Sequence, residues 1–412
     1  MAGHVNKLRG VVRLMRAQPW ASPTAIAERW RERAGVYQEC DHRVHLESAV
    51  GWLCAAQDAV GAGFARGYSL YWHPYFRALG WQPAYPETTG YIIPTLYQLA
   101  DHLGRPDLSE RAHRAARWEV AIQLPTGAVR GGVIGDAPSP AVFNTGQVIL
   151  GWLAAFERTR DAAFADAARR AGRFLVSALG DDSFWRKGQS RFAMEGAALY
   201  NARTAWALAE AGVRLDEPAF VATAKRHLHA VAGRQRPNAW FPECCLSDPS
   251  RPLLHTLAYA VRGLLEGARV LDDGALLDSA KRAAAALAAR VRDDGWMAGR
   301  YAADWQPRAS WSCLTGEAQM ANNWMRLFHL TGEQNWLDAV PRVIAFIKRT
   351  QNLRSGNPGL RGGIKGSAPV NGEYGRYEVL NWATKYFVDA LVRTERLDAD
   401  PATAGRADIV LA

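Results

Sequence analysis

Residues 314–330 read LTGEAQMANNWMRLFHL, and the layout of this stretch recurs along the chain. It opens with Thr315 and Gly316, carries Glu317, Gln319 and Asn323 over its first turns, and is mainly apolar afterwards. Five further stretches have the same layout, and they begin at Thr89, Thr145, Asn201, Thr256 and Asn381. The steps from Thr89 through Thr315 to Asn381 are 56, 56, 55, 59 and 66 residues. A regular period of this size indicates a repeated supersecondary unit.

Each repeat is predicted to hold two helices of different character. The first type, starting near residues 88, 145, 199, 255, 314 and 380, is apolar nearly all round, which is typical of buried helices. The second type, starting near 44, 108, 162, 217, 275 and 334, is amphipathic, as in SAKRAAAALAARVRDD at 279–294. Six buried helices inside six solvent-facing ones predict an all-α fold, an (α/α)6 barrel.

The repeats divide the chain into three parts. Residues 1–43 are expected to form a short N-terminal helical extension with helices at Val5–Arg16 and Pro23–Arg33. Residues 44–397 form the barrel as the catalytic or binding domain, and 398–412 form a loose tail. Thr145, Thr315 and Asn381 are expected as helix N-caps.

Loop lengths predict where function lies. The turns from inner to outer helices are short, as in HLGRPD, whereas the returning loops are long and rich in Gly, Pro and aromatic residues. All long loops therefore gather at one end of the barrel, around the N-termini of the inner helices. Six helix N-termini facing one cavity favour an anionic ligand.

Composition narrows the functional classes. The 412 residues are 49% hydrophobic and contain no apolar run long enough for a transmembrane helix. The N-terminal stretch does not read as a secretory signal, so a cytoplasmic location is expected. The net charge of +10 attracts polyanions, for which nucleic acid and an acidic polysaccharide are the two candidates. The basic residues are scattered without a run, so an Arg-rich solvated surface is expected rather than nucleic-acid binding. The 16 Trp residues include rings suited to stacking on sugars.

No metal or cofactor is predicted. The five cysteines, Cys40, Cys54, Cys244, Cys245 and Cys313, lack the paired spacing of metal sites and are expected to be reduced thiols. The Gly-rich stretches VRGGVIGD and LRGGIKGS lack a preceding strand and the dinucleotide fingerprint, so they are interpreted as tight turns.

A first set of polar residues suggests proton abstraction from a uronic acid. That reaction needs groups that neutralise the sugar carboxylate, for which Asn201 and Arg203 are candidates, and a base, for which His255 or Tyr259 is a candidate. Glu317 is added as a catalytic candidate because an ionised group in an apolar-walled cavity is costly without a partner or ligand. Expected substrate-binding residues are Glu87, Tyr91, Tyr200, Gln147, Gln319, Lys385, Trp240 and Trp305.

Other functions stay open. Glycoside hydrolysis would need two carboxyl groups, drawn from Glu87, Glu317, Glu195, Asp136 and Glu373. A non-catalytic role as a glycan-binding or assembly protein is a second alternative. A small-molecule cyclase or prenyl-type enzyme on the same toroid is a third, although the aspartate-rich signatures of cyclases are absent.

The ordered motifs PETTGYIIPTL, FNTGQVILGWL, LYNARTAWAL, LHTLAYAVRGLLE, CLTGEAQMA and LNWATKYFVDAL carry a family resemblance. Over residues 44–395 the chain resembles the (α/α)-barrel proteins of bacterial exopolysaccharide gene clusters, of the VpsJ type. More distantly it is similar to toroid polysaccharide lyases, glucuronyl C5-epimerases and unsaturated-uronide hydrolases. The resemblance implies a six-hairpin toroid and a link to polysaccharide synthesis machinery, but it transfers no catalytic mechanism.

Overall fold

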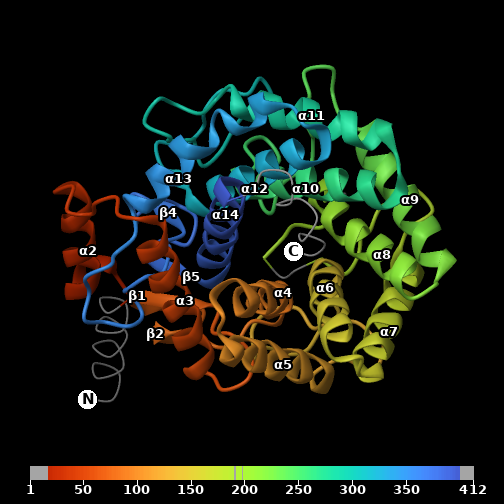
Figure 1. The fold of residues 1–412 in the computed structure, drawn as a ribbon, viewed down its shortest axis with the longest axis horizontal. Helices are drawn as coiled ribbons and strands as arrows, with labels where there is room; N and C mark the ends of the chain where they lie inside the picture. The colour runs from red at the N-terminus through yellow and green to blue at the C-terminus, as the bar shows by residue number, and fades with distance from the viewer. Residues whose placement is uncertain (1–16, 190–191, 197, 400–412) are drawn as a thin grey trace, which may run out of the picture.

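The helices form two concentric rings (Figure 1) in the computed structural model, which describes residues 17–189, 192–196 and 198–399. The inner helices are α4 (Pro86–Leu103), α6 (Val142–Thr159), α8 (Ala202–Arg214), α10 (Leu254–Leu271), α12 (Leu314–Thr331) and α14 (Asn381–Ala399). The outer helices are α3 (His42–Asp58), α5 (Pro106–Ala121), α7 (Ala162–Ala178), α9 (Pro218–Gly233), α11 (Gly274–Ala288) and α13 (Val340–Lys348). The predicted (α/α)6 barrel is therefore confirmed.

The inner ring is closed. Consecutive inner helices pack together from α4 to α14, and α14 packs back against α4. The glycine of the repeated Thr-Gly pair permits this approach, because a Cβ on Gly90 would lie 2.6 Å from Val148 Cα and one on Gly146 would lie 2.8 Å from Thr204 Cα. The pair thus marks the place where one inner helix crosses closely over the next.

The threonine of the same pair fastens the returning loop to the helix. Thr145 Oγ1 accepts the Val129 N–H at 2.9 Å and donates to the Ala141 carbonyl at 2.7 Å. Thr89 makes the same two bonds, with Phe64 and Tyr85. The expectation that Thr145 and Thr315 are N-caps is wrong, because α6 and α12 begin earlier, with N-caps at Ala141 and Cys313.

Short strands, which the sequence did not predict, lie in the long loops. β1 (Gly67–His73), β2 (Ala78–Trp81) and β5 (Glu378–Leu380) form an antiparallel sheet in the order β2-β1-β5. β3 (Ser312–Cys313) pairs with β4 (Ser367–Ala368). Pairing of Tyr68 with Val379 joins the first long loop to the last, so the sheet closes the ring at the end that holds the inner-helix N-termini.

Some predicted boundaries shift. The predicted outer helix 334–350 is split into a 3₁₀ helix, η3 (Gln334–Leu337), and α13, which restarts with a proline in its first turn. The predicted helix from 199 begins as a 3₁₀ helix, η2 (Leu199–Asn201). Short η1 (Pro19–Ala21) precedes α2. The predicted helix at 5–16 and most of the predicted tail lie outside the described residues.

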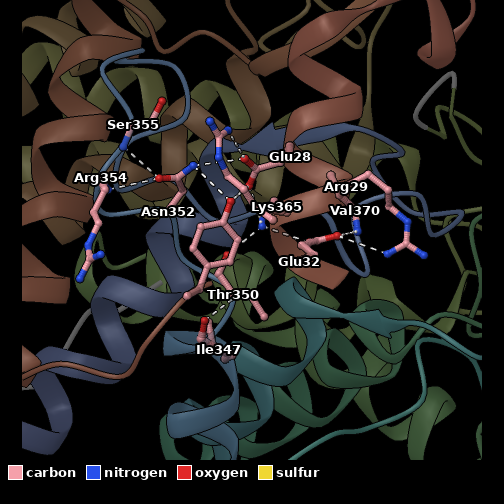
Figure 2. Close-up of polar contacts among 12 residues, drawn as sticks. Glu28, Arg29, Glu32, Ile347, Thr350, Asn352, Arg354, Ser355, Lys365 and Val370 are labelled. Atoms are coloured by element: carbon pink, nitrogen blue, oxygen red, sulfur yellow. Dashed lines mark hydrogen bonds and ion pairs between the residues drawn. The ribbon is translucent and has the colours of Figure 1, made fainter. Parts of the chain in front are cut away.

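Helix α2 (Pro23–Arg33) matches the predicted second helix of the extension and lies outside the ring in Figure 1. Figure 2 shows how it is held. Lys365, 1% exposed, places Nζ 2.9 Å from Glu28 Oε1 and 3.0 Å from Glu32 Oε1 and donates to the Thr350 carbonyl. Glu32 also accepts the Val370 N–H at 2.8 Å. This buried ion cluster fastens α2 to the loop between α13 and α14.

Candidate active site

A cavity of about 170 Å³ lies at the end of the barrel where the inner helices begin. Its walls come from the first turns of those helices and from the long loops around them, as loop lengths predicted. The lining is strongly aromatic and consists of Arg66, Tyr85, Glu87, Tyr91, Phe143, Phe192, Tyr200, Leu246, His255, Tyr259, Tyr374, Gly375 and Trp382.

Among the described helices, none combines the length and apolar character needed to cross a bilayer.

Two titratable residues face the cavity from opposite walls. Glu87 lies in the first turn of α4 and His255 in the first turn of α10. In the closed order α4, α6, α8, α10, α12, α14, these two helices are three places apart and therefore diametrically opposed. A ligand between them would have a carboxyl group on one side and an imidazole on the other.

Glu87 is suited to hold a proton near neutral pH. Glu87 is buried, and Tyr85 Oη donates a hydrogen bond to its Oε2. Burial raises the pKa of Glu87 to about 7, against the lowering influence of the Tyr85 hydrogen bond and of Arg66 and Arg203. A carboxyl group with such a pKa can act as a general acid.

His255 is suited to accept a proton. Its Nδ1 lies 2.8 Å from Gln319 Oε1, which can only accept, so Nδ1 carries the hydrogen and Nε2 keeps the lone pair. Burial lowers the pKa of His255 to about 4, although the Gln319 bond opposes the shift. The imidazole is therefore neutral at pH 7 and available as a base. The predicted binding residue Gln319 thus orients His255.

Tyr91 and Tyr259 line the cavity, and Tyr386 packs against both rings without lining it. We call these three tyrosines the aromatic floor. The Tyr91 and Tyr386 rings lie 5.6 Å apart, and those of Tyr259 and Tyr386 lie 6.4 Å apart. Burial raises the pKa of Tyr259 well above its usual range, so its hydroxyl is a proton donor rather than a base at neutral pH. Tyr259 is therefore less suited than His255 to accept a proton.

Arg203 lies against the aromatic floor, away from the cavity lining. Its guanidinium is 5.1 Å from the Tyr259 ring centre and 5.8 Å from that of Tyr91, and its Nε donates to Gln147 Oε1 at 2.6 Å. Lys385 lies against the same floor, 4.3 Å from the Tyr386 ring centre, and pairs with Asp389 at 2.7 Å. Neither cation is among the residues that line the cavity, so direct contact of Arg203 with a substrate carboxylate is not supported.

The cation that does line the cavity is Arg66, which sequence analysis missed. Its guanidinium lies between Phe76 and Trp382, 4.3 and 4.8 Å from the ring centres. Nη1 donates to Gln82 Oε1 at 2.7 Å and pairs with Glu378 Oε2 at 3.1 Å. Arg66 precedes the first repeated motif, so the repeat pattern gave no signal for it.

Several predicted site residues lie elsewhere. Glu317 Oε1 accepts the Met297 N–H at 2.8 Å and the Ser312 hydroxyl at 2.5 Å, so this carboxyl braces a loop and does not line the cavity. Trp240 and Trp305 pack against each other at 5.0 Å, also away from the lining. Asn201 is buried, and its Oδ1 accepts from Thr204 at 3.3 Å.

Five of the residues predicted at the mouth of the barrel do line the cavity, namely Glu87, Tyr91, Tyr200, His255 and Tyr259. Tyr85, Tyr374 and Trp382 were missed, although the aromatic-rich loops were expected at this end. Trp382 Nε1 donates to Tyr374 Oη at 2.8 Å, which joins two of these missed residues in one wall.

Comparison with solved structures supports the fold. An unsaturated glucuronyl hydrolase specific for heparin superposes with a TM-score of 0.68 at 15% identity, covering 87% of this chain and 98% of that one. Cellobiose 2-epimerase from Bacillus thermoamylovorans superposes with a TM-score of 0.67 at 12% identity, covering 85% of this chain and 98% of that one. An α-amylase from Clostridium perfringens superposes with a TM-score of 0.61 at 11% identity, covering 84% of this chain and 97% of that one. No protein-family model and no curated protein sequence matches the chain.

Proposed function

We propose that the protein is a carbohydrate-active enzyme that removes the C5 proton of a uronate residue in an acidic oligo- or polysaccharide. The observation that carries this proposal is the opposition of Glu87 and His255 across one aromatic cavity. A neutral imidazole on one wall and a protonated carboxyl on the other are the two groups that proton transfer at carbon requires. The aromatic walls suit the apolar faces of sugar rings.

The chemistry follows from these positions. His255 Nε2 takes the C5 proton, and the electron pair of the broken C–H bond moves into the sugar carboxylate. Arg66 in the wall would stabilise the charge that develops there. In an epimerase, Glu87 then returns a proton to C5 from the opposite face. In a lyase, the C4–O bond breaks instead, and Glu87 protonates the leaving oxygen.

Support for the alternatives is weaker. A glycosidase needs two carboxyl groups beside the scissile bond, and Glu87 is the one carboxylate among the described residues that line the cavity. Of the other candidates, Glu373 is an exposed partner of Arg251 and Arg300. A binding protein would use the same aromatic walls but has no need of an opposed acid and base. The same proposal has two finer parts, which fit the sequence resemblance. The substrate is an acidic exopolysaccharide, and the protein acts in the cytoplasm beside the synthesis machinery.

The test is an assay of the purified protein with uronate-containing oligosaccharides in D₂O. Absorbance of an unsaturated uronide would identify a lyase, and deuterium at C5 without cleavage would identify an epimerase. New reducing ends without either signal would replace the proposal with hydrolysis. Binding without any of these changes, over a panel of matched acidic glycans, would favour the non-catalytic alternative.

A further inference from the structure

Helix α2 presents apolar side chains to solvent. Ile26 and Trp30 are four residues apart and therefore share one face of the helix, where they are 54% and 65% exposed. Trp20 lies in η1, which packs against α2, and is 59% exposed. Single exposed apolar residues are common on protein surfaces, but these three lie in one short segment at the outer edge of the molecule (Figure 1).

The opposite face of the same helix is charged and packed against the barrel. Glu28 is fully buried, the side chain of Glu32 is 10% exposed, and both carboxylates pair with Lys365 (Figure 2). Each carboxylate follows Ile26 or Trp30 by two residues, which is a rotation of about 200° around the helix axis. A surface helix ordinarily turns its apolar face inward, so α2 is inverted and its apolar face is left for a partner.

Three arginines border the apolar face. At about 100° per residue, Arg29 lies to one side of the stripe formed by Ile26 and Trp30, Arg31 lies to the other side, and Arg33 lies at its C-terminal end. Arginine side chains can lay their stems along an apolar surface and keep the guanidinium in a polar layer. An apolar stripe with cations on both flanks is typical of a helix that lies in the plane of a membrane surface.

The charges around α2 do not cancel. Lys365 lies 2.9 Å from Glu28 and 3.0 Å from Glu32, whereas the pairs of these carboxylates with Arg31 and Arg29 are longer, at 3.5 and 3.8 Å. With Arg33 included, four cations stand against two carboxylates. The surplus is positive and lies on the arginine side, toward solvent.

The neighbouring chain does not remove this surplus. Glu39 pairs with Arg349 at 3.4 Å and with Lys348 at 3.8 Å. Residues 1–16, which lie outside the described structure, contain four Lys or Arg residues and no Asp or Glu. The sequence up to residue 33 therefore carries seven basic and two acidic residues, which suits an anionic partner.

The apolar side chains favour lipid as that partner. Tryptophan is enriched where a membrane meets water, because its ring is amphipathic. Ile26 has an aliphatic side chain, which suits acyl chains and offers no flat ring for stacking on a sugar. A symmetric contact with a second copy of the chain would set the arginines of one helix against those of the other.

We propose that η1 and α2 form a peripheral membrane-binding surface, which inserts Trp20, Ile26 and Trp30 into the interface of a bilayer that contains anionic phospholipid. The flanking arginines lie at the level of the lipid headgroups. The buried Lys365 cluster holds the barrel to this surface. The proposal does not depend on the chemistry proposed for the cavity.

Cosedimentation of the full chain with vesicles tests this surface. One set of vesicles is phosphatidylcholine alone, and the other is an equal mixture of phosphatidylcholine and phosphatidylglycerol. We expect the protein to bind the mixed vesicles, less so as sodium chloride screens the charges, and to bind the neutral vesicles weakly. The double variant Ile26→Ser, Trp30→Ser should bind the mixed vesicles at least about tenfold more weakly. Val213→Ser, which changes a 58% exposed residue near the end of α8, should bind like the wild type.

Quenching of tryptophan fluorescence by lipids brominated in their acyl chains gives a second readout, and Trp30→Phe should reduce it. The proposal is overturned if the wild type does not bind the mixed vesicles, binds both kinds equally, or binds as well after the double substitution. Without vesicle binding, a wild-type dimer that the double variant loses would assign the surface to a second copy. Binding to an acidic polysaccharide that the double variant loses would assign it to a glycan.

Discussion

Glu87 and His255 stand in the first turns of α4 and α10, which lie three places apart in a closed ring of six inner helices. Burial shifts their pKa values in opposite directions, to about 7 for Glu87 and about 4 for His255. Between about pH 4 and pH 7, Glu87 therefore carries its proton while the His255 imidazole is neutral.

The opposite shifts predict the pH dependence of activity. The active form has neutral His255 and protonated Glu87, so kcat/KM should fall below about pH 4 as His255 gains a proton, and above about pH 7 as Glu87 loses one. In Glu87→Gln the decline above pH 7 should disappear at a lower overall rate. A wild-type profile that keeps rising above pH 8 would contradict the role of Glu87 as an acid.

Replacement of His255 by Asn should remove the base while keeping an amide near the Nδ1 position that faces Gln319. We expect kcat to fall on the order of 10²- to 10⁴-fold with little change in melting temperature. His229→Asn is the matched control, because that imidazole is exposed and pairs with Asp273 on the outer surface. Equal activity of the two variants would refute the assignment.

Glu317 should matter for stability rather than for turnover. Glu317→Ala leaves the buried Met297 N–H and Ser312 hydroxyl without their acceptor, which should cost about 2–4 kcal/mol of unfolding free energy. Glu317→Gln keeps an acceptor oxygen, and it should retain both kcat and most of the stability. Urea denaturation and steady-state kinetics on the two variants separate these effects, and a large loss of kcat in a folded Gln variant would restore a catalytic role.

Lys365 should control the attachment of helix α2. Lys365→Met removes the buried cation between Glu28 and Glu32 and leaves them only their longer pairs with Arg31 and Arg29, which should cost about 3–5 kcal/mol. Limited proteolysis should then cut faster near residues 34–40 than in the wild type. Lys281, which is half-buried and pairs with Glu333, provides the control substitution Lys281→Met, and similar cleavage of both variants would argue against attachment of α2 by Lys365.

The repeat made the barrel predictable, because Gly90, Gly146 and Gly316 mark helix crossings that recur every 55–66 residues in the sequence. The repeat also placed Tyr91, Tyr200, His255 and Tyr259 at the end of the barrel where the cavity lies. The repeat could not predict how deep along the barrel axis each side chain lies. Arg203 is two residues beyond Asn201 in the chain, a little more than half a helical turn, and its guanidinium lies against the tyrosine rings and not in the cavity lining.

Other features depend on contacts between distant segments. The β1–β5 pairing joins residues 67–69 to 378–380, and local propensity in a loop rich in Gly and aromatics gave no reason to expect it. Arg66 directly precedes β1, and its guanidinium packs over the Trp382 ring, so the contacts between these distant segments place it in the cavity wall. Glu317 matches the polar first-turn pattern, but its carboxyl group accepts hydrogen bonds from the Met297 N–H and the Ser312 hydroxyl and does not line the cavity.

Hydrogen exchange at C5 tests the central claim most directly. Uronate oligosaccharides are incubated in D₂O with the wild-type protein and with His255→Asn, and the C5 position is followed by NMR. We expect the C5 proton signal to be lost, by exchange or by elimination, with the wild type and not with the variant. Conversion of a substrate by the wild-type protein with the C5 proton retained would rule out proton abstraction by His255.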